Sequence, residues 1–441
     1  MPTDFSRVSP AHQKAALWMG TLAFTVSFAV WTIFSIIGLK IKEQLGLNDT
    51  EFGLLVAMPI LTGSLIRIFL GVWTEQFGGR IVFFGVMLAG AISAWLLTNA
   101  STYIGFLFAA LCVGIVGGSF TVVITYVSKW FPKEKQGTAL GIVGAGNIGA
   151  AATKILAPLV MVAYGWEGVA KIWAVALAII AVVFLFVTKD EPDLVERKAQ
   201  GVKAVPFMEQ MQPLKELRVW RFSLYYFFVF GAFVALALWL PRYLVGAYGL
   251  DLKTAGLIAA AYSIPASLFR IVGGWASDKY GARKVMYWTF IGSVICTFLL
   301  AYPATTYVVQ GVRGPVEFTF AITLVPFTVL VFTLGFFMSL GKAAVYKHIP
   351  VYYPKNVGSV AGVVGMIGGL GGFILPIVFG ALNDLIGVWT SCFMLLFALV
   401  AIALTWMHFA IRRMDEARHP ELRRDTDLPE VMNQTGAPAP H

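Results

Sequence analysis

The sequence predicts an all-α membrane protein, with twelve transmembrane helices arranged in two pseudo-symmetric six-helix bundles. Of its 441 residues, 58% are hydrophobic and only 13% are charged, and the mean hydropathy is +0.78. A soluble domain carries about 25% charged residues. Apolar runs of about 20 residues, long enough to cross a bilayer as a helix, recur along the whole chain. A motif that occurs once in each half indicates two related bundles.

The apolar runs define the expected spans. A pore-forming β-barrel would show short alternating segments instead, and the first run is too long for the apolar region of a cleaved signal peptide. The predicted spans are residues 17–39, 52–74, 81–99, 103–128, 138–163, 168–188, 220–246, 253–276, 284–302, 318–345, 357–382 and 387–411.

A polar segment divides the chain near its midpoint. Residues 189–219 form the longest polar stretch between spans. We expect this segment to be a cytoplasmic linker that joins a bundle of residues 17–188 to a bundle of residues 220–411. Residues 1–16 and 412–441 are then cytoplasmic tails.

The positive charge follows the expected topology. Of the 33 Lys and Arg residues, 23 lie in tails and loops on the side of the N-terminus, six lie on the opposite side and four lie within spans. Because cytoplasmic loops carry an excess of Lys and Arg, we expect a multi-pass protein of the bacterial cytoplasmic (inner) membrane with both termini cytoplasmic. The net charge of +10 is therefore mostly topological, and there is no basic soluble module to favour nucleic-acid binding.

Two arginines at membrane depth, Arg67 and Arg270, begin the repeated motif. Each is followed by Gly at +4, an acidic residue at +8, Gly at +11 and Arg at +13. A charge at this depth costs about 2.5–3.5 kcal/mol to insert, so two charges in related positions predict one central site between the halves. The later positions are Gly71, Glu75, Gly78 and Arg80 in the first copy, and Gly274, Asp278, Gly281 and Arg283 in the second.

The other cations at membrane depth are Lys154 and Lys342, and no Asp or Glu lies near the middle of a predicted span. A bound anion would compensate these charges, which disfavours cation exchange and proton coupling through a buried carboxylate. Arginine at both related positions favours a planar oxyanion, because a guanidinium donates two parallel hydrogen bonds. The alternative is that an arginine binds backbone carbonyls at helix ends.

Two interpretations are open for each lysine. Lys154 lies seven residues after Asn147, on the same face of the fifth span, and Lys342 lies in the inner half of the tenth. Each either snorkels to a membrane surface or faces the cavity, where burial and like charge favour release of a proton. Lys154 and Lys342 are therefore the proton-coupling candidates.

The fifth and eleventh spans are rich in glycine. Such glycines allow a backbone or a small ligand to approach closely, although tight helix packing alone also explains them. The fifth span follows Trp130-Phe131-Pro132-Lys133 and contains Gly141, Gly144, Gly146, Asn147 and Gly149; the eleventh follows Tyr352-Tyr353-Pro354-Lys355 and contains Gly362, Gly365, Gly368, Gly369, Gly371 and Gly372.

The inner loops after the second and eighth spans read Gly-x-x-x-(Glu/Asp)-x-x-Gly-x-Arg, which resembles the signature loop of the major facilitator superfamily. The resemblance implies two bundles that rock around a central cavity. It assigns gating of the inner side to the loop residues Gly71, Glu75, Arg80, Gly274, Asp278 and Arg283.

The glycine runs and the paired arginines together resemble the nitrate/nitrite porter (NarK-type) family. That resemblance implies that Arg67 and Arg270 hold nitrate, assisted by Tyr226 and Asn147. Phe120, twelve residues before Pro132, matches the family's aromatic position on the fourth span. The expected substrate layer is completed by Phe230, which shares a helix face with Tyr226, and by Gly144, Gly146, Gly368 and Gly371.

The expected function is nitrate transport by alternating access. We favour nitrate/proton symport in the direction of import, because the extra titratable cations suit a symporter. Nitrate/nitrite antiport is the alternative, followed by exchange of another small anion such as formate or oxalate. The expected partners are nitrate or nitrite, protons and membrane lipids, and we expect a monomer.

Other protein classes have little support in the sequence. We find no nucleophile–base pair, metal cluster or phosphate loop, so we expect neither an enzyme nor a cofactor. A sensor would normally append a soluble output domain. Cys112, Cys296 and Cys392 lie in three different spans without metal-ligand spacing and are expected to be apolar core residues rather than a disulfide.

Overall fold

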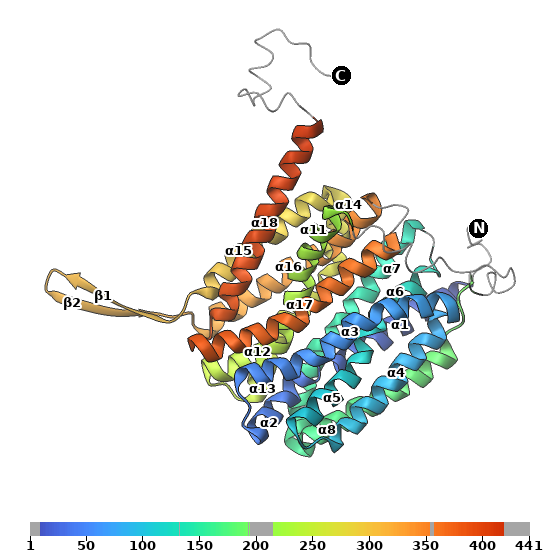
Figure 1. Cartoon of the computed structure of the whole chain (residues 1–441), viewed down its shortest axis with the longest axis horizontal. Coiled ribbons are helices and arrows are strands. Elements are labelled where there is room, and N and C mark those ends of the chain that lie inside the picture. The colour runs from blue at the N-terminus through green and yellow to red at the C-terminus, as the bar shows by residue number, and fades with distance from the viewer. Residues whose placement is uncertain (1–8, 132, 193, 195–214, 353–356, 419–441) are drawn as a thin grey trace, which may run out of the picture.

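Helices of membrane-spanning length make up most of the chain. The structure, a computed structural model, describes residues 9–131, 133–192, 194, 215–352 and 357–418. Figure 1 shows the helices packed side by side, with a two-stranded hairpin projecting from one end. Among these residues, eleven helical segments are long and apolar enough to span a membrane. One of these, Ala139–Val187, is 49 residues long and is broken at Gly165, whose φ of 68° and ψ of 179° are not helical.

That break separates two of the predicted spans, so the twelve-span fold is confirmed. The N-terminal half contains α1 (Pro10–Trp31), α2 (Phe34–Leu45), α3 (Asp49–Phe77), α4 (Gly79–Leu96), η2 (Leu97–Asn99), α5 (Tyr103–Val113), η3 (Gly114–Gly118), α6 (Ser119–Ser128), α7 (Lys133–Gly144), η4 (Ala145–Ile148) and α8 (Gly149–Val187). The C-terminal half contains α11 (Leu217–Tyr226), η6 (Phe227–Ala232), α12 (Phe233–Tyr248), α13 (Leu252–Leu268), α14 (Arg270–Tyr280), α15 (Ala282–Ala301), β1 (Thr305–Gly311), β2 (Gly314–Phe320), α16 (Leu324–Tyr352), α17 (Val357–Ile386) and α18 (Ser391–Arg418).

Several predicted boundaries were wrong. Residues 318–320, assigned to the tenth span, belong to β2, which pairs antiparallel with β1; α16 begins only at Leu324. The β-branched and aromatic residues in 305–320 favour strands, but Phe318 and Phe320 lie directly before the apolar run of the following helix, which led to their assignment to that span. Helix α1 begins at Pro10, inside the predicted tail, and α18 continues to Arg418. Most of the predicted linker, residues 195–214, lies outside the described residues.

The two halves meet along two seams formed by helices of opposite bundles, α3 with α17 and α8 with α13. Glycine allows the close approach in both seams. A Cβ at Gly380 of α17 would collide with the carbonyl oxygen of Asp49, and a Cβ at Gly256 of α13 would collide with the carbonyl oxygen of Lys154. The space between the two bundles is therefore bordered by two seams at which their backbones touch.

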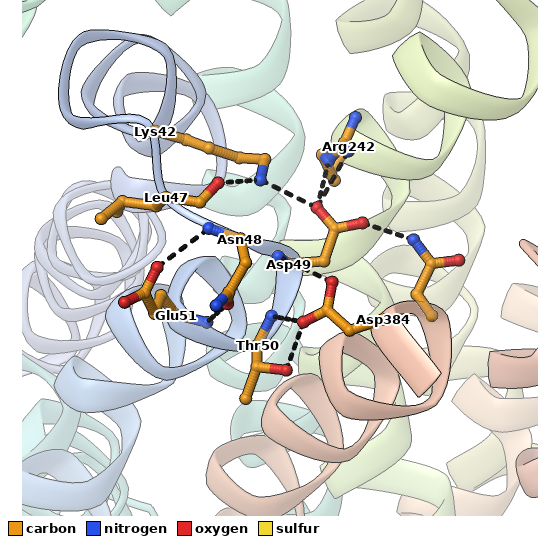
Figure 2. A network of polar contacts seen from close by, with 9 residues as sticks. Lys42, Leu47, Asn48, Asp49, Thr50, Glu51, Arg242 and Asp384 are labelled. Atoms are coloured by element: carbon orange, nitrogen blue, oxygen red, sulfur yellow. Dashed lines mark hydrogen bonds and ion pairs between the residues drawn. The ribbon is translucent and has the colours of Figure 1, made fainter. Parts of the chain in front are cut away.

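A polar network joins the bundles at the end where α2 and α3 meet, which we call the outer end (Figure 2). The Asp49 carboxylate accepts a hydrogen bond from Arg242 Nε of α12 at 2.9 Å and lies 3.0 Å from Lys42 Nζ of α2. It also accepts a hydrogen bond from the Asn383 amide. The Asp384 carboxylate of α17 accepts from the backbone N–H groups of Asp49 and Thr50, at 3.1 and 2.7 Å, and so caps the first turn of α3 from the other bundle. Asp384, predicted to follow the eleventh span, lies within α17.

Candidate functional site

The predicted site residues lie where spanning helices lose regular α-geometry. Phe120 follows the 3₁₀ segment η3, Asn147 lies in the 3₁₀ segment η4, and Tyr226 directly precedes the π-helical segment η6, which contains Phe230. Arg270 begins α14 directly after Phe269, whose ψ of 0° ends α13. Such interruptions inside membranes occur where backbone groups line a site or are satisfied by neighbouring protein.

Arg67 is buried and binds backbone carbonyl groups from both bundles. Its Nε and one terminal nitrogen donate to Gly117 O at 3.3 and 3.2 Å, and its other terminal nitrogen donates to Gly365 O of α17 at 3.2 Å. A guanidinium has five N–H donors, so these three bonds leave donors for a ligand. The carbonyl contact that we considered as an alternative for an arginine is therefore present at Arg67, together with spare donor capacity.

Arg270 is equally buried but has a different environment. It is 6% exposed, and its guanidinium forms no hydrogen bond or ion pair with any residue in the described part of the chain. Gly144 packs directly against its side chain, because a Cβ there would lie 3.0 Å from Arg270 Cδ and 3.1 Å from Nε. A buried charge without a hydrogen bond is costly, so Arg270 is the stronger indication of a bound anion.

One aromatic ring connects the two arginines. The Phe120 ring centroid lies 5.9 Å from Arg67 Cζ and 5.3 Å from Arg270 Cζ. Trp31 and Phe230 lie 5.6 and 5.4 Å from Arg67 Cζ. Such contacts contribute roughly 0.5–2 kcal/mol each, less than a buried charge requires. The rings therefore hold the guanidinium groups in place without neutralising them.

Tyr226 and Phe230 form the wall contributed by the seventh span. Their rings stack at 5.1 Å with an interplanar angle of 9°, and Tyr346 of α16 meets Tyr226 edge-on at 4.9 Å. A Cβ at Gly368 would collide with the Tyr226 ring. Tyr346 also lies 5.9 Å from Arg270 Cζ. The structure thus brings Tyr226, Phe230 and Gly368 together beside the arginines.

Asn147 is buried, and neither its amide nitrogen nor its amide oxygen has a hydrogen-bond partner among the described residues. An uncharged donor in this state suits a polar ligand. Two of the predicted glycines have packing roles instead. Gly146 faces Phe24, and Gly371 faces the backbone of Gly231; their Cβ positions do not meet either arginine.

Neither lysine reaches the membrane surface. Both are fully buried; Lys154 Nζ donates to Ala150 O at 3.0 Å, whereas Lys342 Nζ lies 3.6 Å from the Phe233 ring centroid without a hydrogen bond to the described residues. The snorkelling interpretation is therefore excluded in this conformation. No described carboxylate forms an ion pair with Arg67, Arg270 or either lysine.

At the inner end, the described contacts of the gating candidates lie within single bundles. Arg80 donates to Leu185 O at 2.6 and 3.1 Å and lies 3.4 Å from Asp190, and Arg283 donates to the Tyr352 hydroxyl at 3.0 Å. The side chains of Glu75 and Asp278 lie outside the described residues. Gly71 and Gly274 have no close neighbour that would exclude a Cβ.

Glu191 adds a contact at the inner end that the sequence did not indicate. Its carboxylate accepts from Gly79 N at 2.7 Å and lies 3.9 Å from Lys129 Nζ, which ties the start of the linker to the loop after the second span. Burial raises the pKa of this carboxyl, although the Gly79 amide and Lys129 act in the opposite direction.

Sequence reasoning also missed residues near Arg67. Gly117 and Gly365 provide its carbonyl partners, and Ser64, buried and without a hydrogen bond to the described residues, meets the position of a Cβ on Gly369. Backbone acceptors carry no side-chain signal. Tyr346 could have been found from the sequence, because it lies one turn after Lys342 on α16 and the two polar side chains share a helix face.

Comparison with known proteins identifies the family. The model of the Major Facilitator Superfamily matches residues 19–316 and 244–437. A Thermus thermophilus protein named "Probable nitrate/nitrite antiporter NarK1" is 42% identical, over 97% of this chain and 98% of its own length. The chain belongs to the NarK-type nitrate/nitrite porters of the major facilitator superfamily.

Other porters agree with this assignment. The "Nitrite extrusion protein" of Bacillus subtilis is 30% identical, over 91% of this chain and 96% of its own length. The "Probable nitrate transporter NarT" of Staphylococcus haemolyticus is 31% identical, over 86% and 92%. The crystal structure of a bacterial homologue of the lysosomal transporter Spinster, inward-facing and occupied, aligns with a TM-score of 0.69 at 15% identity, over 92% of this chain and 98% of that one. This likeness confirms the fold.

A pair of glycines in α7 tests the geometry around Arg270. We predict that Gly144→Ala weakens the thermal stabilisation of the purified porter by small oxyanions, because the new methyl group displaces the Arg270 side chain. Gly141→Ala is the matched control, since its Cβ would meet only Ile271 Cα, at 4.0 Å. Equal oxyanion-induced shifts of Tm in both variants would contradict the placement of Arg270 beside Gly144.

Proposed function

We propose that this porter carries nitrate across the bacterial cytoplasmic membrane by alternating access, with Arg67 and Arg270 as the main substrate ligands. The observation that carries the proposal is the set of buried cations without a carboxylate partner in the described chain, two of which flank one ring. A planar oxyanion suits two guanidinium groups. The names of the relatives, which mention nitrate and nitrite, support this choice of anion.

We propose further ligands beside the two arginines. Asn147 offers an uncharged amide donor, and Tyr226 a hydroxyl group. Phe120 and Phe230 restrict the size of the anion, and Gly144 and Gly368 leave room for Arg270 and Tyr226. We propose that the domains are the two predicted bundles, with the first extended back to Pro10 and the second running from Leu217 to Arg418. We also propose that both termini are cytoplasmic, as the excess of Lys and Arg on their side favours.

We further propose coupling to protons and net import of nitrate. Lys342 is the stronger candidate for the coupling group, because its ammonium group faces a ring rather than a hydrogen-bond acceptor, which favours the neutral form. Lys154 has one carbonyl acceptor and is the second candidate. Nitrate/nitrite exchange is the competing mechanism, in agreement with the name of the Thermus relative.

Uptake into proteoliposomes separates these mechanisms. Nitrate uptake into vesicles that contain no anion substrate, with dependence on an inward proton gradient, is the expected result and supports symport. Nitrate uptake only into vesicles preloaded with nitrite would establish exchange and assign the lysines an electrostatic role. Transport of formate or oxalate but not of nitrate, by folded protein, would contradict the proposed substrate.

We predict that Arg67→Lys and Arg270→Lys each lower nitrate uptake by roughly tenfold to a hundredfold, because one lost hydrogen bond to a charged group costs about 1.5–3 kcal/mol. Uptake per folded molecule in proteoliposomes is the measurement. Arg313→Lys in the exposed turn of the hairpin is the control. Full uptake by either site variant would exclude the two-arginine clamp.

We predict that Lys342→Gln abolishes stimulation of uptake by a proton gradient while nitrate still binds. Lys154→Gln serves as the comparison at the second candidate, and Lys253→Gln, an exposed lysine at the outer end, is the control. The measurements are gradient-driven uptake and nitrate binding by calorimetry. If both buried lysines can be replaced without loss of gradient stimulation, lysine-mediated coupling is wrong.

We predict that the outer network holds the outer side closed, so that Arg242→Gln and Asp384→Asn favour opening there. The readout is the reaction of Ile60→Cys, buried in the α3–α17 seam, with an impermeant thiol reagent added from outside, in a protein without native cysteines. The rate should rise several-fold. Lys40→Gln, which breaks an exposed pair with Glu43, should leave it unchanged; a similar rate in all variants would contradict this role.

A further inference from the structure

A groove on the side of the C-terminal bundle that faces away from the N-terminal bundle lies between α11 and α18, the first and last helices of that bundle. It has a volume of about 740 Å³. Leu217 and Arg221 of α11 form one wall, and α18 from Ala401 to Met414 forms the other. The groove is remote from Arg67 and Arg270, because none of its lining residues contacts either arginine. It opens beside the start of α11 and the end of α18, at the end of the protein opposite the polar network of Figure 2.

The walls of this groove face lipid. Only 22% of the most apolar stretch of α18 is buried within the protein, the lowest fraction among the spans of the described chain. Ile402 and Phe409 are 57% and 56% exposed, and Leu217 is 70% exposed. Exposed apolar side chains at membrane depth contact acyl chains, so the interior of the groove is hydrocarbon in character.

The mouth of the groove is basic. Arg221 and Arg413 both line it, and neither forms an ion pair with a carboxylate whose side chain the structure describes. Arg413 is exposed and Arg221 partly exposed, so both guanidinium groups are accessible to a ligand. Two accessible arginines beside an apolar groove complement a molecule with an anionic head and a hydrocarbon tail.

The length of the groove matches one leaflet. Ile402 and Arg413 are eleven residues apart on α18, which corresponds to about 16 Å along a helix. Half of a bilayer's hydrocarbon core is about 15 Å thick. A headgroup at Arg413 would therefore place an acyl chain along α18 as far as the middle of the membrane.

We propose that this groove is a binding site for one anionic phospholipid of the leaflet on the side of the termini. Arg221 and Arg413 bind its phosphate, and one acyl chain lies along α18 between Phe409 and Ile402. The lipid bridges α11, the first helix after the linker, and α18, the last helix of the bundle. The site does not depend on the identity of the transported anion.

Native mass spectrometry of the full-length protein, titrated in detergent with phosphatidylglycerol or phosphatidylcholine, tests the proposal. We expect tighter binding of phosphatidylglycerol, and a loss of roughly fivefold in its affinity for each of Arg221→Gln and Arg413→Gln. Lys14→Gln removes an exposed cation from α1 of the other bundle and should change nothing. Losses no larger than in Lys14→Gln, or equal binding of the two lipids, would overturn the proposal.

A filled groove distinguishes a lipid site from a merely basic surface. Ala410→Phe keeps both arginines and occupies the apolar wall, so it should weaken phosphatidylglycerol binding as strongly as loss of an arginine. If Ala410→Phe does not elute as a folded monodisperse protein, Ala401→Leu, which fills the deeper end of the groove, is used in its place. Wild-type affinity in the folded filled variant, or inhibition of lipid binding by water-soluble glycerophosphate, would show that the arginines bind phosphate without a chain in the groove.

Discussion

Uncompensated positive charge at membrane depth is the constraint on which the rest of this structure depends. Arg67, Lys154, Arg270 and Lys342 are buried without an ion-pair partner in the described chain. Each would be costly in a bilayer unless polar groups or a ligand compensate it. The protein meets part of this cost with carbonyl groups and aromatic rings, and we propose that the bound anion meets the rest. On this proposal, the charges that make the empty protein less stable are those that bind the anion.

The interrupted helices follow from the same constraint. A regular membrane helix satisfies its own backbone groups and offers none to a neighbour. Gly117 of η3 has a carbonyl group that accepts two hydrogen bonds from Arg67, and η4 contains the buried Asn147. Other glycines, Gly380 of α17 and Gly256 of α13, allow the α3–α17 and α8–α13 seams to close. Glycine thus has two separate roles at different positions, since Gly117 offers its carbonyl group to Arg67 and the seam glycines let the bundles approach closely.

The sequence predicted the spans, their grouping and the burial of both arginines, because hydropathy and a repeated motif are local signals. It failed at residues 318–320, where the end of the hairpin is aromatic and adjoins the apolar run of α16. It also gave no sign of the roles of Gly117 and Gly365, because both roles belong to the backbone. Whether Lys154 and Lys342 reach the membrane surface could not be predicted from the sequence, because snorkelling depends on which neighbours cover the side chain in the fold. At Gly146 and Gly371 the sequence pattern resembled the family's substrate-binding pattern, but their nearest contacts in the structure are packing contacts with Phe24 and Gly231.

Equilibrium binding of nitrate tests the central claim most directly. Calorimetric titration of the purified protein should show one nitrate per chain, and the double variant Arg67→Gln/Arg270→Gln, if folded, should show none. Loss of binding in that variant would mean that the two buried guanidinium groups form the anion site. Undiminished binding in the folded double variant would contradict the account and would place the anion elsewhere in the protein.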